Sequence, residues 1–111
     1  MNLSTKQGIF AVNIALLILE INKRSFTCTF GEAFRTTEQA EWNAARGIGI
    51  KDSQHCKRLA LDLNLFKDGV YCADGESWQQ FGAHWKTLNT LNRWGGDFLR
   101  KDFNHVEMQE G

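Results

Sequence analysis

The chain has 111 residues, with 13 basic and 13 acidic side chains and no formal net charge. A chain of this length suits a single hydrophobic core, so we predict one domain over residues 1–111. The basic residues are scattered along the chain, which argues against nucleic-acid binding. Three cysteines without a CxxC spacing favour a reducing compartment over a disulfide framework.

The apolar run over residues 9–21 could form a buried helix, a signal peptide or a membrane anchor. A membrane-spanning helix needs about 20 predominantly apolar residues, whereas Asn13 and Glu20 interrupt this run. No cleavage site of small residues ends it. We therefore favour an amphipathic helix capped by Ser4 or Thr5, without stable membrane insertion. Its buried face would carry Phe10, Ile14, Leu17, Ile18 and Ile21.

A strand pattern and a helix pattern follow. Apolar and polar side chains alternate over residues 25–30, which predicts a half-buried strand. The inner face of that strand would carry Phe26, Cys28 and Phe30. The helix over residues 36–47 begins with a capping box of Thr36 and Gln39 and ends at Gly47, a residue typical of helix C-termini.

The second half of the chain repeats both patterns. Residues 59–66 alternate between leucines and polar residues, with Asp62 on the polar face. A tight turn at Asp68 and Gly69 returns the chain as a short partner strand. A third helix over residues 77–91 would bury Trp78, Phe81, Trp85, Leu88 and Leu91. A glycine-broken loop and a strand-like end complete an α+β fold, in which about three helices pack on a small antiparallel sheet.

The stretch SQHCKRLALD, residues 53–62, places a histidine and an aspartate seven residues apart. A fully extended chain would separate His55 from Asp62 by about 23 Å and point the two side chains to opposite faces. A shared ligand therefore requires a bend at residues 56–58. From these residues alone, the commoner interpretation is that His55 is a solvated loop histidine and Asp62 a surface aspartate. A metal site is the alternative interpretation.

Three segments between residues 34 and 107 together resemble one family. SQHCKRLALD is similar to the SxHxxGxAxD motif of the zinc peptidases that include D-Ala-D-Ala carboxypeptidases, dipeptidases and phage L-alanyl-D-glutamate endopeptidases, with Arg58 in place of the motif's glycine. RWGGDFLRKDFNHVE resembles the second half of the family pattern, where a tryptophan and two glycines precede an ExxH or DxxH pair. FRTTEQ resembles its aromatic-Arg-Ser/Thr segment.

The resemblance implies a zinc site in a cleft at the sheet, with one Zn²⁺ per chain. Its ligands would be His55, Asp62 and His105, and Asp102 would be the general base. Zinc bound by two imidazoles and one carboxylate lowers the pKa of its water and polarises a scissile carbonyl. Glu107 shares a strand face with His105 and is the alternative base, or else a salt-bridge or hydrogen-bond partner of a ligand.

The remaining polar and aromatic residues near these motifs divide between substrate contact and structure. The resemblance implies that Arg35 contacts the substrate and the transition state. We assign His84 to the third helix as a structural histidine and Cys56 as an incidental thiol. Trp94, with the two glycines after it, would wall the cleft, and Asp97 would brace that turn.

The same resemblance implies a zinc metallopeptidase that cuts peptidoglycan stem peptides. Asp102 favours the L-alanyl-D-glutamate endopeptidases, as in a phage or prophage endolysin. D,D- or L,D-carboxypeptidase action on stem-peptide ends is one alternative, and a non-catalytic, zinc-stapled wall-binding relative is another. The protein is expected to be a monomer made in the bacterial or phage-infected cytoplasm. It would act on the cell wall after release by a holin or with a virion.

Overall fold

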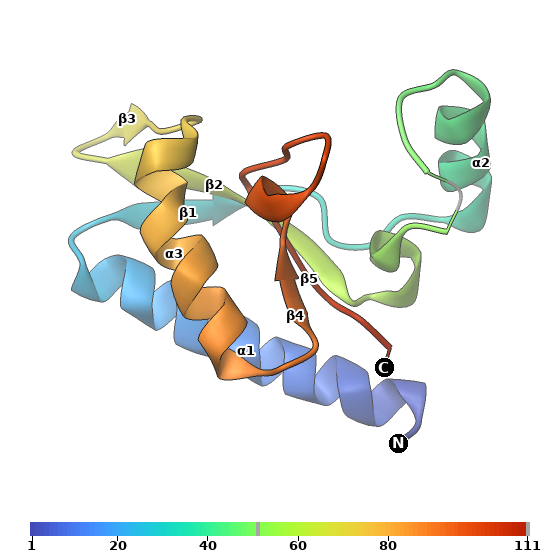
Figure 1. Ribbon diagram of the computed structural model, residues 1–111, viewed down its shortest axis with the longest axis horizontal. Helices are drawn as coiled ribbons and strands as arrows, with labels where there is room; N and C mark the ends of the chain where they lie inside the picture. Colours follow the sequence, from blue (N-terminus) through green and yellow to red (C-terminus); the bar gives the residue numbers. More distant parts are fainter. Residues whose placement is uncertain (51, 111) are drawn as a thin grey trace.

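The computed structural model describes residues 1–50 and 52–110. Within these residues, three α-helices pack with five short antiparallel strands, which confirms the predicted α+β class (Figure 1). The helices are α1 (Leu3–Lys23), α2 (Thr37–Ala45) and α3 (Gly75–Leu88). The strands are β1 (Thr27–Phe30), β2 (Ala60–Lys67), β3 (Val70–Tyr71), β4 (Asn92–Trp94) and β5 (His105–Met108). Two 3-10 turns, η1 (Gln54–Lys57) and η2 (Gly95–Asp97), precede β2 and follow β4.

Strand β2 organises the sheet, whose order is β1-β2-β5-β4. The first residues of β2 pair with β5, and its later residues pair with β1. Strand β3 returns along the end of β2 through Asp68 and Gly69, both with positive φ, as the predicted tight turn requires. The register places Asp62 directly opposite His105. The sheet itself therefore brings together two polar residues that are far apart in the sequence.

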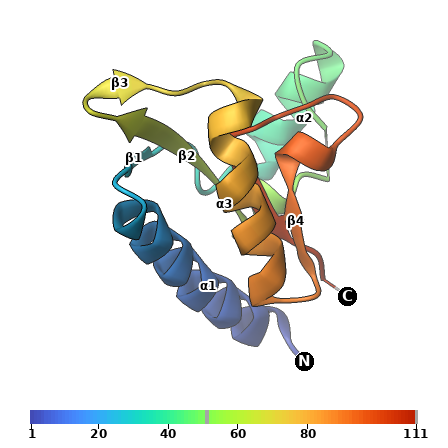
Figure 2. The same cartoon turned by 60° about the vertical axis from the view of Figure 1, so that its left-hand side comes forward.

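The hydrophobic core lies between the leucine face of β2 and the helices α1 and α3. Figure 2 shows the arrangement of these two helices and the strand. Leu61, Leu63 and Leu65 of β2 are buried, as their alternation predicted, while Asp62 lies on the opposite face. Full burial of one such side chain contributes about 1.5–3 kcal/mol. The core partners from the helices are Phe10, Ile14, Leu17, Ile21, Trp78, Phe81 and Trp85. One face of β2 thus packs in the core and stabilises the fold, and the opposite face can carry the residues of a functional site.

Helix α1 is long and apolar enough to cross a membrane by length and composition alone. Its 21 residues include an 18-residue window of mean hydropathy 1.3, of which 28% is buried. The face predicted for the core is buried at Phe10, Ile14, Leu17 and Ile21, as expected of a packed helix. The cap differs from the prediction. Asn2, rather than Ser4 or Thr5, accepts a hydrogen bond from the Thr5 backbone N–H.

Other boundaries and one face also differ from the sequence-based predictions. Phe30 is 68% exposed rather than buried, because it is the last residue of β1 and only Phe26 and Cys28 of the predicted inner face pack against the core. Helix α3 begins at Gly75, after the Asp74 cap, and it ends before Leu91. Strand β4 was not predicted, because three residues are too few to show an alternation. The capping of α2 by Thr36 and its termination at Gly47 are confirmed.

The predicted bend after His55 is present and centres on Arg58. This residue has φ 56° and ψ 36°, the left-handed conformation that glycine adopts without strain. The Leu59 N–H donates to the Gln54 carbonyl, and the Arg58 N–H donates to the His55 carbonyl. This is the Schellman pattern that commonly ends a helix at a glycine. The Arg58 guanidinium lies over the Phe34 ring, 4.1 Å from its centroid, and offsets part of the strain.

We expect Arg58→Gly to be more stable than Arg58→Ala by about 1 kcal/mol, because both variants lose the Phe34 contact but only alanine keeps the left-handed strain. Urea unfolding with a chelator present measures the difference without a contribution from bound metal. Lys57 offers a matched control. It lies inside η1, so the order of its glycine and alanine variants should reverse. Equal stability of the two Arg58 variants would contradict a strained bend.

Candidate metal centre

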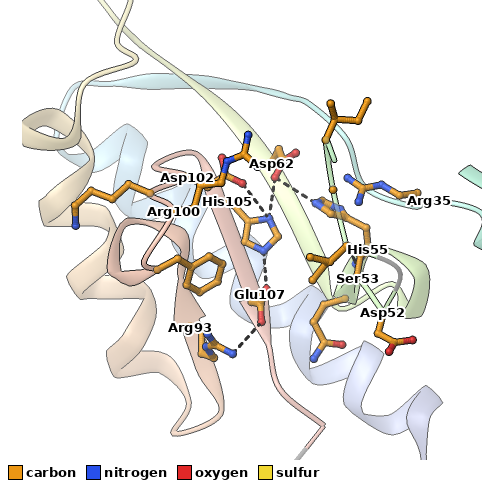
Figure 3. Close-up of a pocket in the computed structure, with 16 residues that line it drawn as sticks. Arg35, Asp52, Ser53, His55, Asp62, Arg93, Arg100, Asp102, His105 and Glu107 are labelled. Carbon is orange, nitrogen blue, oxygen red and sulfur yellow. Dashed lines mark hydrogen bonds and ion pairs between the residues drawn. The ribbon is translucent and has the colours of Figure 1, made fainter. Parts of the chain in front are cut away.

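Three potential metal ligands meet on the polar side of β2. His55 comes from η1, Asp62 from β2 and His105 from β5 (Figure 3). Asp62 Oδ1 lies 3.4 Å from His55 Nε2 and 3.1 Å from His105 Nδ1. One donor atom from each residue lies within 4.8 Å of the others. Both histidines are buried and Asp62 is half-buried, so the three side chains converge in a largely enclosed site.

Local hydrogen bonds orient His55. The Ser53 hydroxyl accepts from the His55 backbone N–H at 3.2 Å and starts η1, and the bend at Arg58 then turns the chain into β2. The His55 side chain places Nδ1 3.0 Å from the Ala33 carbonyl, which can only accept a hydrogen bond. Nδ1 therefore carries the proton. The lone pair of Nε2 is left facing Asp62, which is the arrangement a metal-binding histidine needs.

His105 and Asp62 form a buried, charged pair. Burial alone would lower the pKa of His105, but hydrogen bonds and charge from Asp62 and Glu107 raise it to about 9. Burial alone would raise the pKa of Asp62, but His105 and His55 lower it to about 2. Without metal, the imidazolium of His105 thus donates from Nδ1 to Asp62 and from Nε2 to Glu107.

The donor set fits zinc. Donors about 2.0–2.2 Å from one tetrahedral zinc ion lie about 3.3–3.6 Å from one another, close to the separations of Asp62 from the two histidines. Two imidazole nitrogens and one carboxylate oxygen are a typical ligand set of catalytic zinc, which keeps a fourth position open. His55, Asp62 and His105 would hold the ion. His105 must first lose its Nδ1 proton.

Asp102 is brought beside the three ligands by a close contact between two backbone segments. Its backbone N–H donates to the Gly95 carbonyl at 2.9 Å. A Cβ at Gly95 would lie 2.0 Å from the Asp102 carbonyl oxygen, so only glycine fits there. The Asp102 carboxylate is 4.0 Å from His105 Nδ1, and its side chain is 55% exposed. A base in this place can reach both the metal ligands and solvent.

Arg35 lies on the other side of the ligands, in the loop before α2. Its backbone N–H donates to the His55 carbonyl at 3.2 Å, and its guanidinium pairs with Glu32. The side chain lines the same pocket as the three ligands and Asp102. The structure therefore gathers all five residues singled out from the sequence. Cys56 lies on η1 and His84 on α3, and neither belongs to the three-residue group.

The pocket has a volume of about 720 Å³ and includes residues that the motifs did not indicate. Phe98 packs beside the His105 ring with centroids 5.6 Å apart, and the Arg93 guanidinium lies over Phe98. Trp94 was predicted to wall the cleft but does not line it. It is buried, donates from Nε1 to the Phe103 carbonyl and packs on Gly82 and Gly96. Phe98 is the aromatic residue of the wall.

The sequence signals for these additional residues are weak. Arg93 and Arg100 line the pocket, but arginine is common on exposed segments. Phe98 follows a turn, where apolar periodicity gives no information about orientation. Asp97, predicted to brace that turn, forms an ion pair with Lys86 of α3 at 2.7 Å. Only the position of the glycines signalled that this loop approaches another segment closely.

Comparisons with known proteins agree with this site. A family model described as D-alanyl-D-alanine carboxypeptidase matches residues 47–108, more than half of the chain. No curated protein matches the chain. The L-Ala D-Glu endopeptidase ChiX of Serratia marcescens has a similar structure, with a TM-score of 0.65 and 18% identity, over 75% of this chain and 67% of that one.

A second similar structure is a mutant of the vancomycin-resistance D,D-pentapeptidase VanY, from a VanB-type resistance cassette, in complex with Zn(II). Its TM-score is 0.63 at 14% identity, over 89% of this chain and 70% of that one. At these identities the two likenesses show a common fold. The family match covers η1, β2, the glycine loop and β5, which carry the three potential ligands and Asp102. The chain therefore belongs to the D-alanyl-D-alanine carboxypeptidase family of zinc peptidases.

Proposed function

We propose that this protein is a zinc-dependent L-alanyl-D-glutamate endopeptidase that cleaves peptidoglycan stem peptides. The observation that carries the proposal is the place of the three ligands within the pocket. Arg35 and Asp52 line the pocket on one side of them, and Arg100 lines it on the other (Figure 3). An endopeptidase needs room for peptide on both sides of the scissile bond, and this pocket extends to both sides.

The charges of the pocket support the same substrate. Glutamate has two carboxyl groups, so a D-Glu residue that is linked onward through one of them can keep the other as a free carboxylate. Arg35, Arg93 and Arg100 all line the pocket, and guanidinium groups are suited to bind carboxylates. ChiX, which has a similar fold, is an L-Ala D-Glu endopeptidase. A phage or prophage origin, with release to the wall during lysis, stays a prediction.

Each residue of the site has a role in the proposed reaction. Zinc held by His55, Asp62 and His105 would supply an acidified water and would polarise the scissile carbonyl. Asp102, at the open side of the pocket, accepts a proton from the attacking water and passes it to the departing amine. Arg35, held by Glu32 and by its backbone contact to His55, stabilises the developing oxyanion. His55 and His105 present one ring nitrogen each, because the other nitrogen is already hydrogen-bonded.

A D,D- or L,D-carboxypeptidase is the second candidate. The matching family model is described as D-alanyl-D-alanine carboxypeptidase, and VanY is a D,D-pentapeptidase. The same ligands and base would serve that reaction, because only the position of the scissile bond in the stem peptide differs. We favour the endopeptidase because residues line the pocket on both sides of the ligands, which leaves room for peptide on both sides of the scissile bond.

Digestion of isolated peptidoglycan distinguishes the two activities. We expect the zinc-loaded protein to release fragments with a new N-terminal D-Glu, and a chelator to abolish the release. Amino-terminal labelling and mass spectrometry identify the product. Free D-Ala as the main product would establish the carboxypeptidase instead. No release by the zinc-loaded protein would contradict both enzymes and favour a wall-binding role.

Metal analysis of variants tests the ligand set. After dialysis, the wild-type protein should retain about one zinc per chain, while His55→Ala and His105→Ala should retain almost none. Asp102→Asn should keep its zinc and lose activity by a factor of about 10² or more, because only the proton acceptor is removed. Elemental analysis and the peptidoglycan assay measure the two properties. Zinc retained in both histidine variants would refute the ligand assignment.

Zinc affinity should depend on pH through His105. The His105 imidazole is protonated below its pKa of about 9, and zinc requires the neutral ring. The apparent affinity should therefore rise by about tenfold per pH unit between pH 7 and 8.5 and level off above about pH 9. Chelator competition at several pH values measures the slope. A flat profile over this range would show that no proton leaves His105 when zinc binds.

A further inference from the structure

Glu107 is a buried acidic residue beside the metal centre that the proposed reaction does not use. It lies on β5, is 7% exposed, and places Oε1 2.7 Å from His105 Nε2. Its other oxygen, Oε2, is 3.8 Å from the Arg93 guanidinium. Taking a carboxylate out of water is costly unless it is paired. The contacts with His105 and Arg93 explain how the Glu107 carboxylate can be buried, and they suggest that it acts on His105.

The backbone holds Glu107 firmly in this position. In the sheet it lies between Ala60 of β2 and Arg93 of β4, as their register partner on either side. Its carbonyl accepts a hydrogen bond from Nε1 of the buried Trp85. Because Glu107 is two residues beyond His105 on the same strand, the two side chains share a face. The carboxylate thus reaches His105 from a rigid part of the fold.

Glu107 contacts the edge of the His105 ring that faces away from Asp62. Asp62 approaches Nδ1, while Glu107 approaches Nε2 (Figure 3). A carboxylate accepts but does not donate, so Nε2 must keep its proton. Nδ1 is then the nitrogen with a free lone pair once a metal binds. This geometry argues against Glu107 as a ligand or a base, because His105 separates it from the ligand atoms.

Resting on the zinc site of the proposed function, we infer that Glu107 is a positioning residue that fixes the orientation and tautomer of His105 for metal binding. The Arg93 guanidinium compensates the buried negative charge of Glu107. It lies over the Phe98 ring, 4.7 Å from the ring centroid. Hydrogen-bond partners of this kind typically change metal affinity 10- to 100-fold when removed. Of the alternatives that the sequence left open for Glu107, the geometry favours a hydrogen-bond partner of a ligand over a base.

Zinc affinity of Glu107 variants tests the inference. Glu107→Ala should weaken zinc binding by about 10- to 100-fold, measured by chelator competition at fixed pH on the full chain. Glu107→Gln keeps an oxygen acceptor for His105 Nε2–H and should recover most of the affinity. Glu110→Ala is the matched control, because Glu110 is an exposed carboxylate that pairs with Lys57 away from the ligands. It should bind zinc as the wild type does.

The position of the His105 proton provides a second readout. In long-range ¹H–¹⁵N spectra of the zinc-loaded wild type, His105 should show a protonated Nε2 and a metal-bound Nδ1. In Glu107→Ala, the spectra should no longer show this single tautomer, or should show a mixture of the two tautomers of His105. A purely structural role would lower the unfolding temperature of the metal-free protein and leave both zinc readouts unchanged.

The outcomes separate this inference from the proposed function. Wild-type affinity and tautomer in both Glu107 variants would overturn the positioning role, whatever the peptidase activity. If Glu107→Ala does not fold, a folded Glu107→Leu protein, which fills similar space without an acceptor, would overturn it by keeping wild-type zinc affinity and a protonated Nε2 on His105. A wild-type protein that bound no zinc would overturn both proposals. Loss of affinity in Glu107→Ala, without peptidase activity in the wild type, would support the positioning role alone.

Discussion

The metal centre depends on the pairing of Asp62 with His105 across β2 and β5. The two residues are 43 positions apart, and only the antiparallel register places them opposite each other. Without metal, a buried ion pair of this kind adds little to stability, because apolar residues of similar volume would pack as well or better. A carboxylate and an imidazole in this position, with a second imidazole beside them, are more readily explained by a shared metal ion than by the needs of the fold.

The approach of His55 to this pair requires backbone strain, and the surrounding structure compensates for it. Arg58 adopts a left-handed conformation at the position where the family motif has glycine. Two backbone hydrogen bonds of the Schellman pattern and the contact with Phe34 hold it there. Non-glycine residues in this conformation persist where neighbouring interactions determine the path, often beside functional sites. The departure from the motif therefore changes the residue while the geometry that carries His55 to Asp62 remains.

The two faces of the sheet have different roles: one packs in the hydrophobic core, and the other carries the metal ligands. The leucines of β2 pack against α1 and α3, so the core holds the strand in place without contributing a polar group to the pocket. The polar face carries Asp62, and β5 adds His105 with Glu107 on the same face. Loops supply the remaining groups, Arg35 before α2 and Asp102 after η2. Strands β2 and β5 thus hold two of the three potential ligands and the turn η1 holds the third, while more exposed loops hold the proposed base and the proposed substrate contact.

The amino-acid sequence by itself determined the elements with strong local signals. The leucine alternation of β2, the Thr36 cap, the turn at Asp68 and Gly69, and the need for a bend near Arg58 all follow from neighbouring residues. Motif resemblance added the ligands, which local patterns alone left ambiguous. Only the tertiary structure decided that Phe30 is exposed at the end of β1, that Phe98 rather than Trp94 walls the pocket, and that Glu107 contacts His105 from the far side. These features depend on strand order and on contacts between distant segments, which no local periodicity records.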